Sequence, residues 1–289
     1  TGMVVNMKVF EDAGITEFPK TPEAFVAALE TIKESNPEVT PLYTNYAAGW
    51  TLSNWDFTRT GVSGDPDVTT KMAEDSAPFE AGDTMNTIYD VLFQVAEKGL
   101  IEADPTTSDW EQSKLDLASG NVAVIVLGSW AVPQIQELAE GHEEDITFQT
   151  FPVTATDGKQ YMGVGGDYNL AINVNSEHKE AARTLLDWLI NESDYAVDNG
   201  GLQAVKGGDY PASLKASQEA GVVLLEENAA PEGKESLFSD VNNMSELGVG
   251  ATDLEKQRII DAAIGNTDET FEEIMADFNA RWADAIKEV

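Results

Sequence analysis

The sequence of 289 residues predicts an α/β fold, in which helices cover a sheet. The first observation is the run Val122–Leu127, where four of six successive apolar residues have a branched Cβ, which favours extended backbone. Such a run, stopped by Gly128, is typical of a strand buried on both faces. The second observation is that apolar residues recur at helical spacing in 84–97 and 270–286. A buried strand among amphipathic helices indicates a helix-covered sheet.

Composition excludes several classes of protein. The chain is 42% hydrophobic and has no run of about 18 apolar residues, so one or two globular domains and no transmembrane helix are expected. It contains no cysteine, which excludes disulfides, thiolate catalysis and cysteine-based zinc sites. His142 and His178 lie in polar segments, and the acidic stretches 65–67 and 80–83 lack EF-hand spacing. No metal site, cofactor or catalytic residue is predicted.

The charge balance is strongly acidic. The chain has 52 Asp and Glu against 17 Lys and Arg, a formal net charge of −35, and the acidic residues are spread along its length. Such a chain repels nucleic acid and anionic membrane surfaces, so no nucleic-acid partner is expected. We interpret the acidity as a means of solubility in an external or salty medium.

The N-terminal half predicts alternating strands and helices. Residues 2–10 predict a short strand and the start of a helix, and 39–46 predict a second strand. Thr21 and Pro22 are residue types preferred at a helix N-cap and in the first turn. Further helices are predicted from Thr21 to Ile32 and over 84–97, the second ending at Gly99. A third is predicted over 110–118, with Ser108 or Asp109 as its cap and with Leu115 and Ala118 facing the core.

The C-terminal half continues this alternation. Strands are predicted at 146–151 and 170–174, and Ser176 is the predicted cap of a helix whose broad apolar face includes Trp188 as a core residue. Shorter helical segments are predicted after Trp130, with Ile135 and Leu138, and over 219–230. The stripe of 270–286 predicts an amphipathic C-terminal helix.

Aromatic and polar residues gather at two places. Trp50 and Trp55 lie five residues apart with Asn45 and Asn54 alongside, and because five residues do not share a helix face, one is expected to face a ligand while the other packs. Trp130 follows the end of a buried strand, the rim where open α/β sheets bind ligands. Core packing is the open alternative for these tryptophans, and it is the interpretation that we give to Trp110.

A glycine-rich stretch follows near the middle of the chain. In Gly163–Gly166 the missing side chains let the backbone approach a ligand closely, and the carboxylate of Asp167 is suited to accept two hydroxyl hydrogen bonds. A simple turn is the open alternative. The spacing matches neither GxGxxG nor the Walker motif, so this stretch is not a phosphate loop.

Four motifs together resemble the extracellular solute-binding proteins of bacterial ABC importers, in the sugar-binding branch that includes maltose-binding protein. They are the strand and Gly-Ser-Trp of 120–130, the segment VNMKVFEDAGI of 5–15, the Phe-Pro that ends 146–152, and NSEHKEAARTLLDWL of 175–189, which is the most specific. The turn at 200–207 is similar as well, with Gln203 where the family has proline.

This resemblance implies a two-lobed periplasmic-binding-protein-like fold of type II. It assigns 1–165 and 236–289 to lobe two and 166–235 to lobe one, with Asn242 on the return crossing. Thr1 begins at what resembles a crossing between the lobes, so the first part of lobe one, with its signal peptide, is expected to be absent from this sequence. The helix around Trp188 then lacks its partner sheet, and its apolar face is expected to be exposed, self-associated or covered by a separate piece.

The implied function is capture of a mono- or oligosaccharide between two lobes and its delivery to ABC permease subunits, without chemistry. The implied location is extracellular, as a membrane-anchored lipoprotein or a periplasmic protein. Two alternatives stay open, a glycosidase and a stand-alone carbohydrate-binding module. A glycosidase needs two carboxylates across the sugar, but in so acidic a chain the presence of carboxylate pairs carries no information. The sequence also contains no GxSxG nucleophile elbow. A peptide ligand also stays open. The candidate ligand-binding residues are Trp130, Trp50, Trp55, Asp167, Gly166, Asn45, Asn54 and Asn242.

Overall fold

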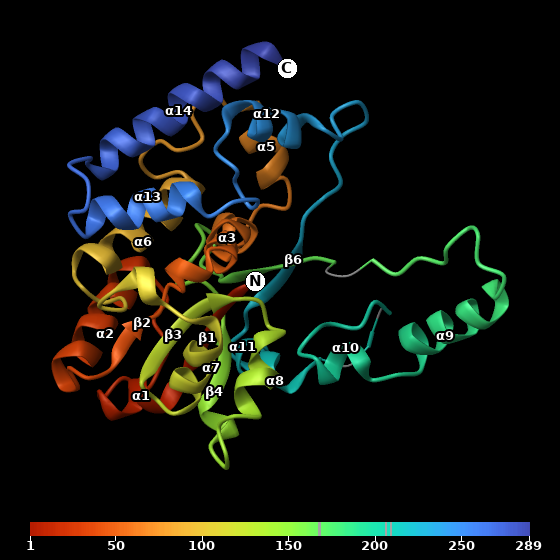
Figure 1. Cartoon of the computed structure of the whole chain (residues 1–289), viewed down its shortest axis with the longest axis horizontal. Coiled ribbons are helices and arrows are strands. Elements are labelled where there is room, and N and C mark those ends of the chain that lie inside the picture. The colour runs from red at the N-terminus through yellow and green to blue at the C-terminus, as the bar shows by residue number, and fades with distance from the viewer. Residues whose placement is uncertain (167–168, 206, 209) are drawn as a thin grey trace.

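A four-stranded mixed sheet organises the computed structural model, which describes residues 1–289 except 167–168, 206 and 209 (Figure 1). The strand order is β2-β3-β1-β4, with β2 parallel to β3 and β1 antiparallel to both β3 and β4. All six residues of β3 are buried, as the apolar run predicts. The strands are β1 Gly2–Asn6, β2 Thr40–Leu42, β3 Val122–Leu127 and β4 Ile146–Gln149.

Alternate residues of the sheet serve two hydrophobic cores. Val4 pairs with Ile125 and both side chains enter one core, whereas Met3 pairs with Val126 and both enter the other. This follows from the period of two in a strand. A sheet covered on both faces explains why β1 and β3 carry no polar alternation, so the α/β class predicted from the sequence is confirmed.

The larger core lies under helices from both ends of the chain. Helix α2 begins as predicted, because the Thr21 hydroxyl accepts a hydrogen bond from the Ala24 amide and Pro22 occupies the first turn. The C-terminal helix α14 begins with a complete capping box between Thr270 and Glu273. The helices associated with this core are α1 Met7–Asp12, α2 Pro22–Ser35, α3 Ser53–Phe57, α4 Arg59–Ser63, α5 Val68–Glu74, α6 Thr84–Glu97, α12 Leu237–Ser245, α13 Leu254–Ala263 and α14 Phe271–Glu288.

Shorter helices cover the other face of the sheet. The cap of α7 is Asp109, whose carboxylate accepts from the Gln112 amide at 2.8 Å, which decides between the two predicted caps. The apolar stripe of α7 is narrower than predicted: Leu117 and Ala118 are buried, but Leu115 is exposed. The helices on this side are α7 Trp110–Ala118, α8 Ala131–Gln136 and α11 Lys215–Glu219, and the short 3-10 segments are Tyr46–Ala48, Trp50–Leu52, Pro105–Thr107, Glu143–Asp145 and Ala212–Leu214.

A second sheet of two parallel strands, β5 Tyr161–Val164 and β6 Val223–Glu226, lies where the chain leaves and re-enters the main body. Between them the chain forms an arm with α9 Lys179–Asn191 and α10 Tyr195–Asp198, and α9 projects away from the rest (Figure 1). Residues 212–226 return to the main body, where Ser217 Oγ donates to the Phe148 carbonyl of β4 at 2.7 Å. Residues 212–219 pack on β4, and the sequence-based assignment of 166–235 to lobe one stays a prediction.

The arm is where the sequence-based expectations differ most from the structure. Residues 170–174 form no strand among the described residues, and Leu170 and Val174 are exposed, because no strand edge lies alongside them. Helix α9 is capped by His178 rather than Ser176, and none of its thirteen residues is buried. Trp188 is 50% exposed and is not a core residue here.

Strand β5 is held by close backbone packing on α4. A Cβ built at Gly61 of α4 would lie 2.8 Å from the Tyr161 carbonyl oxygen and 3.2 Å from the Gly163 nitrogen. Backbone atoms cannot move aside as a flexible side chain does.

Within the described ranges, none of the helices is both long and apolar enough to cross a lipid bilayer.

Gly61→Ala is expected to lower the free energy of unfolding by about 1–3 kcal/mol, the usual cost of overpacking. In an open helix the same change would stabilise by about 1 kcal/mol through helix propensity, so the sign of the effect reports the contact with β5. Urea unfolding followed by circular dichroism measures it. Gly165→Ala, where a Cβ meets no described atom within 4 Å, is the matched control, and equal stability of both variants would contradict the close packing.

Candidate functional site

Three tryptophans from distant parts of the sequence meet beside the end of β3. Trp50 opens a 3-10 turn, Trp110 is the first residue of α7, and Trp130 is the N-cap of α8. The ring centroids of Trp50 lie 5.3 Å from Trp110 and 6.0 Å from Trp130, and those of Trp110 and Trp130 lie 6.0 Å apart. We call these three residues the tryptophan cluster.

The rings of the tryptophan cluster differ in their access to solvent. Trp50 is 48% exposed, whereas Trp110 and Trp130 are half-buried. The Lys114 ammonium lies 5.0 Å from the centre of the Trp110 ring, so one face of this ring already makes a cation–π contact. Trp110 therefore supports the other two rings, and Trp50 and Trp130 offer aromatic surface to a ligand.

Local backbone explains the orientation of Trp130. A Cβ at Gly128 would lie 2.3 Å from Trp130 Nε1, so glycine at this position lets the indole fold back over the end of β3. Because β3 is buried and ends at Leu127, the ring stands at the edge of the sheet. Apolar ring faces at such an edge suit the apolar face of a sugar.

The segment before Trp50 is held by a buried carboxylate. Glu102 accepts hydrogen bonds from the amide and the hydroxyl of Thr44, each at 2.7 Å. Burial raises the pKa of Glu102 above its usual value, and these hydrogen bonds oppose that rise. The chain then turns at Asn45, which has left-handed φ and ψ. The base of the Trp50 segment is thus fixed by polar contacts inside the protein.

Helix α13 holds the same segment from another side. Tyr46 donates its hydroxyl to Asp261 at 3.0 Å, and the Gln257 side-chain amide donates to the Tyr46 carbonyl at 3.0 Å. Burial, helped by the hydrogen bond to Asp261, raises the pKa of Tyr46 to about 12. Tyr46 is therefore a neutral donor near pH 7, and Trp50 is presented by a fixed loop.

A buried ion pair anchors α3, which follows Trp50 directly. The Lys256 ammonium lies 2.7 Å from Asp56, and both side chains are fully buried. Asp56 also accepts from the Tyr89 hydroxyl at 2.7 Å and from the Gly250 amide at 2.6 Å. Burial, together with the charge of Asp56, raises the pKa of Tyr89 well above its usual value. These contacts join α3, α6 and α13 behind the tryptophan cluster.

Several predicted ligand contacts are buried and have structural partners instead. Trp55 is 1% exposed and packs edge-on against Phe151, so of the two neighbouring tryptophans Trp50 is the one that faces out. The Asn45 side-chain amide donates to Ser113 Oγ at 3.2 Å, and that of Asn54 donates to the Thr51 carbonyl at 3.0 Å. The amide nitrogens of both asparagines are thus bonded within the protein, whereas Asn45 Oδ1 is buried without a partner among the described residues.

The remaining predicted residues lie apart from the cluster or outside the described residues. Asn242 is buried in α12, where it donates to the Val249 carbonyl and accepts from the Val249 amide. Gly166 is exposed at the start of the arm, and Asp167 lies outside the described residues. The residue that the sequence-based site prediction omitted is Trp110.

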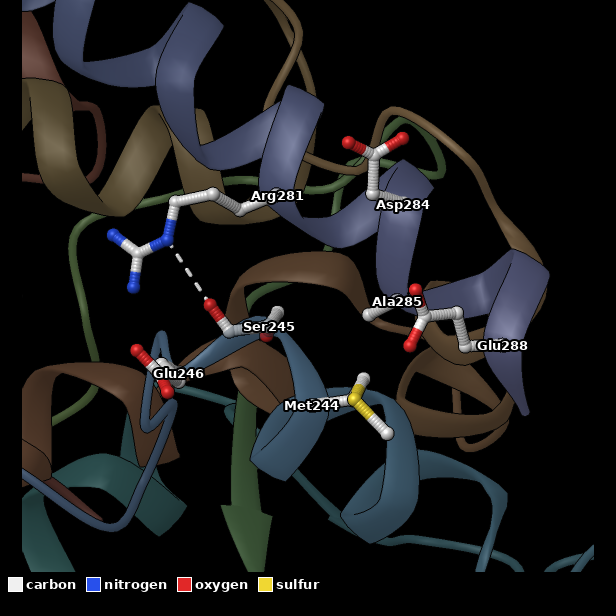
Figure 2. A pocket seen from close by; sticks show the side chains of 7 residues that line it. All are labelled: Met244, Ser245, Glu246, Arg281, Asp284, Ala285 and Glu288. Atoms are coloured by element: carbon white, nitrogen blue, oxygen red, sulfur yellow. Dashed lines mark hydrogen bonds between the residues drawn. The ribbon is translucent and has the colours of Figure 1, made fainter.

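A cavity of about 260 Å³ lies between the C-terminal ends of α12 and α14 (Figure 2). Arg281 Nε donates to the Ser245 carbonyl there at 3.0 Å, and its guanidinium also contacts Glu255. None of the tryptophan cluster lines this cavity. Its lining residues are Met244, Ser245, Glu246, Arg281, Asp284, Ala285 and Glu288.

Comparison with protein families matches residues 1–196 to the family described as bacterial extracellular solute-binding protein. The chain belongs to this family. Comparison with curated protein sequences gave no match. Members of the family bind a solute and perform no chemistry on it, so the chain is a solute-binding protein and the glycosidase alternative is set aside.

Solved structures of solute-binding proteins are similar over the whole chain. A manno-oligosaccharide specific solute-binding protein from Bifidobacterium animalis subsp. lactis, in complex with mannotriose, is 38% identical, with a TM-score of 0.92. A binding protein of an ABC transporter from the same subspecies, in complex with mannobiose, is 36% identical, with a TM-score of 0.91. In each case the match covers 100% of this chain and 69% of the other.

A more distant structure shows the fold alone. It is a sugar transporter from Bacillus licheniformis in complex with stachyose, which is 17% identical with a TM-score of 0.67. The match covers 98% of this chain and 71% of that one. The α/β fold of this chain is thus also found in this distant sugar transporter.

Proposed function

We propose that this chain is the ligand-capturing component of an ABC importer for short manno-oligosaccharides. The observation that carries the proposal is the tryptophan cluster, which presents Trp50 and Trp130 at the edge of a buried sheet. Aromatic rings bind the apolar face of a pyranose, and polar groups around them bind the hydroxyls. The ligand class is supported by the two proteins of 36–38% identity, which bind mannobiose and mannotriose.

We propose a two-lobed arrangement around this site. Residues 1–165 and 236–289 form lobe two, which carries the tryptophan cluster, and the chain passes to lobe one after β5. The packing of 212–219 on β4 supports a shorter lobe-one part than 166–235. Closure of two lobes around a sugar would exclude water and present a closed surface to permease subunits.

Mannotriose is expected to raise the melting temperature of the chain. A ligand at a hundredfold excess over its Kd adds about 2.7 kcal/mol of stability, which is a shift of several degrees for a protein of this size. Differential scanning fluorimetry with mannotriose, mannobiose and stachyose measures the shift, and chromatography of the recovered sugar checks that it is unchanged. Absence of a shift with mannotriose at millimolar concentration, or release of smaller sugars, would contradict the proposal.

We propose that the protein works outside the cytoplasmic membrane, as a lipoprotein or a periplasmic protein. The family description as extracellular supports this location, and a net charge of −35 suits a solvated surface. Fractionation of the source cells with an antibody to this chain distinguishes the forms. Recovery with membranes that only detergent releases indicates a lipid anchor, and recovery in the cytosol would contradict the proposal.

A further inference from the structure

One face of α13 lies along the segment that presents Trp50. Asp253, Gln257 and Asp261 are spaced by four residues and therefore share a helix face. Asp261 binds the Tyr46 hydroxyl and Gln257 binds the Tyr46 carbonyl. Asp253 stands at the end of this stripe that is nearest to Trp50.

The position of Asp253 follows from two contacts on either side of Trp50. A Cβ at Gly49 would lie 2.2 Å from Asp253 Oδ2, so the carboxylate occupies the space that a side chain at position 49 would take. Gly49 has a φ of +66°, which favours glycine. On the other side, Ser53 Oγ donates to the Thr252 carbonyl at 3.5 Å. The Asp253 carboxylate therefore lies against the backbone next to Trp50.

Asp253 differs from the other carboxylates around the Trp50 segment. Asp56, Glu102 and Asp261 are each hydrogen-bonded by protein donors. Asp253 is the N-cap residue of α13, yet its side chain caps no amide, and no donor or cation among the described residues binds it. The side chain is half-buried, so solvent or a ligand reaches it. Its acceptor oxygens therefore have no protein donor among the described residues and lie against the backbone that precedes Trp50.

We propose that Asp253 accepts hydrogen bonds from hydroxyls of the sugar unit that stacks on Trp50, and so determines which saccharides bind. This inference rests on the proposed function. A pyranose on an aromatic face projects its hydroxyls from the ring edge, and a carboxylate accepts from two neighbouring hydroxyls. Its negative charge also disfavours anionic sugars. The site would therefore select neutral saccharides whose hydroxyls at this position are free.

Asp253→Asn is expected to raise the Kd for mannotriose about tenfold or more, because a hydrogen bond to a charged acceptor is lost. Isothermal titration calorimetry of the 289-residue chain, extended to millimolar sugar, measures the change. The same substitution should lower the ratio of the Kd for an anionic trimannuronate to the Kd for mannotriose, because the negative charge that disfavours the anionic sugar is removed. Because the Asp253 side chain caps no amide of α13, the substitution removes no capping hydrogen bond and the melting temperature should be retained. Asp284→Asn, the same change on the exposed side of α14, is the matched control and should keep the Kd of the unaltered chain.

The outcomes separate this inference from the function on which it rests. If the unaltered chain binds mannotriose and Asp253→Asn binds it equally well, or if Asp284→Asn weakens binding as much, the role of Asp253 is overturned while the proposed function stands. If the unaltered chain binds no saccharide, the proposed function is overturned and the role of Asp253 with it.

Discussion

Trp130→Ala is expected to weaken mannotriose binding by about 1–3 kcal/mol, a loss of roughly five- to 150-fold in affinity. The ring stands at the end of β3 and contacts Trp50, so its removal takes away stacking surface and leaves Trp110 as the remaining partner of Trp50 in the cluster. Isothermal titration calorimetry measures the affinity and urea unfolding measures the stability. Because the ring is only half-buried where it packs against the smaller core, the free energy of unfolding should change less than the free energy of binding.

Comparison among the tryptophans makes this prediction specific. Trp50→Ala should weaken binding to a similar extent, since Trp50 is the most exposed ring of the cluster. Trp188→Ala is a control, because it removes an exposed tryptophan from α9 and leaves the cluster intact. A large loss of stability with unchanged affinity in Trp130→Ala would place this ring in the structural core and contradict the proposed site.

The parts of the site that the sequence predicts are those encoded by local patterns. The apolar run and Gly128 placed Trp130 at the rim of a buried sheet, because both features act over a few residues. The order of helix and strand around this run also indicates that Trp110 lies near Trp130. Helix α7 runs into β3 through a tight turn, so the start of this helix returns to the end of the strand, where Trp130 lies.

Other site residues depended on contacts that local patterns do not contain. The spacing of Trp50 and Trp55 required that they face different ways, but which one is exposed depends on Phe151, about a hundred residues later. The buried state of Asn45 likewise depends on Ser113. Polar residues next to aromatic residues are consistent both with a sugar site and with a loop interior in which polar side chains form hydrogen bonds within the protein.

Helix α9 shows the same limit for the fold. Its amphipathic pattern predicts a helix, and a helix forms, because the pattern and the helix propensity are local. The prediction that Trp188 is buried needs a second surface, and none of the described residues supplies one. Periodicity indicates which face of a helix is apolar, while burial depends on what packs against that face.

Lys256→Met is expected to lower the free energy of unfolding by about 3–5 kcal/mol, the largest effect predicted for a single substitution here. Lys256 and Asp56 are both fully buried and 2.7 Å apart, and methionine has nearly the same shape without the charge. The substitution leaves the Asp56 carboxyl group in the interior with the Tyr89 hydroxyl and the Gly250 amide as its remaining donors. Removing one partner of a buried pair leaves an uncompensated charge, which costs more than the lost attraction between exposed charges.

Lys287→Met supplies the matched control for this experiment. Lys287 pairs with Asp284 at 2.8 Å on the surface, where both side chains are more than 70% exposed, and such pairs contribute about 0–1 kcal/mol. Urea unfolding followed by circular dichroism compares the two variants through the midpoint and the slope. Because α3 follows Trp50 directly, Lys256→Met should also weaken mannotriose binding, whereas Lys287→Met should not. If both variants unfold at the same urea concentration, the pair behind the tryptophan cluster does not anchor α3.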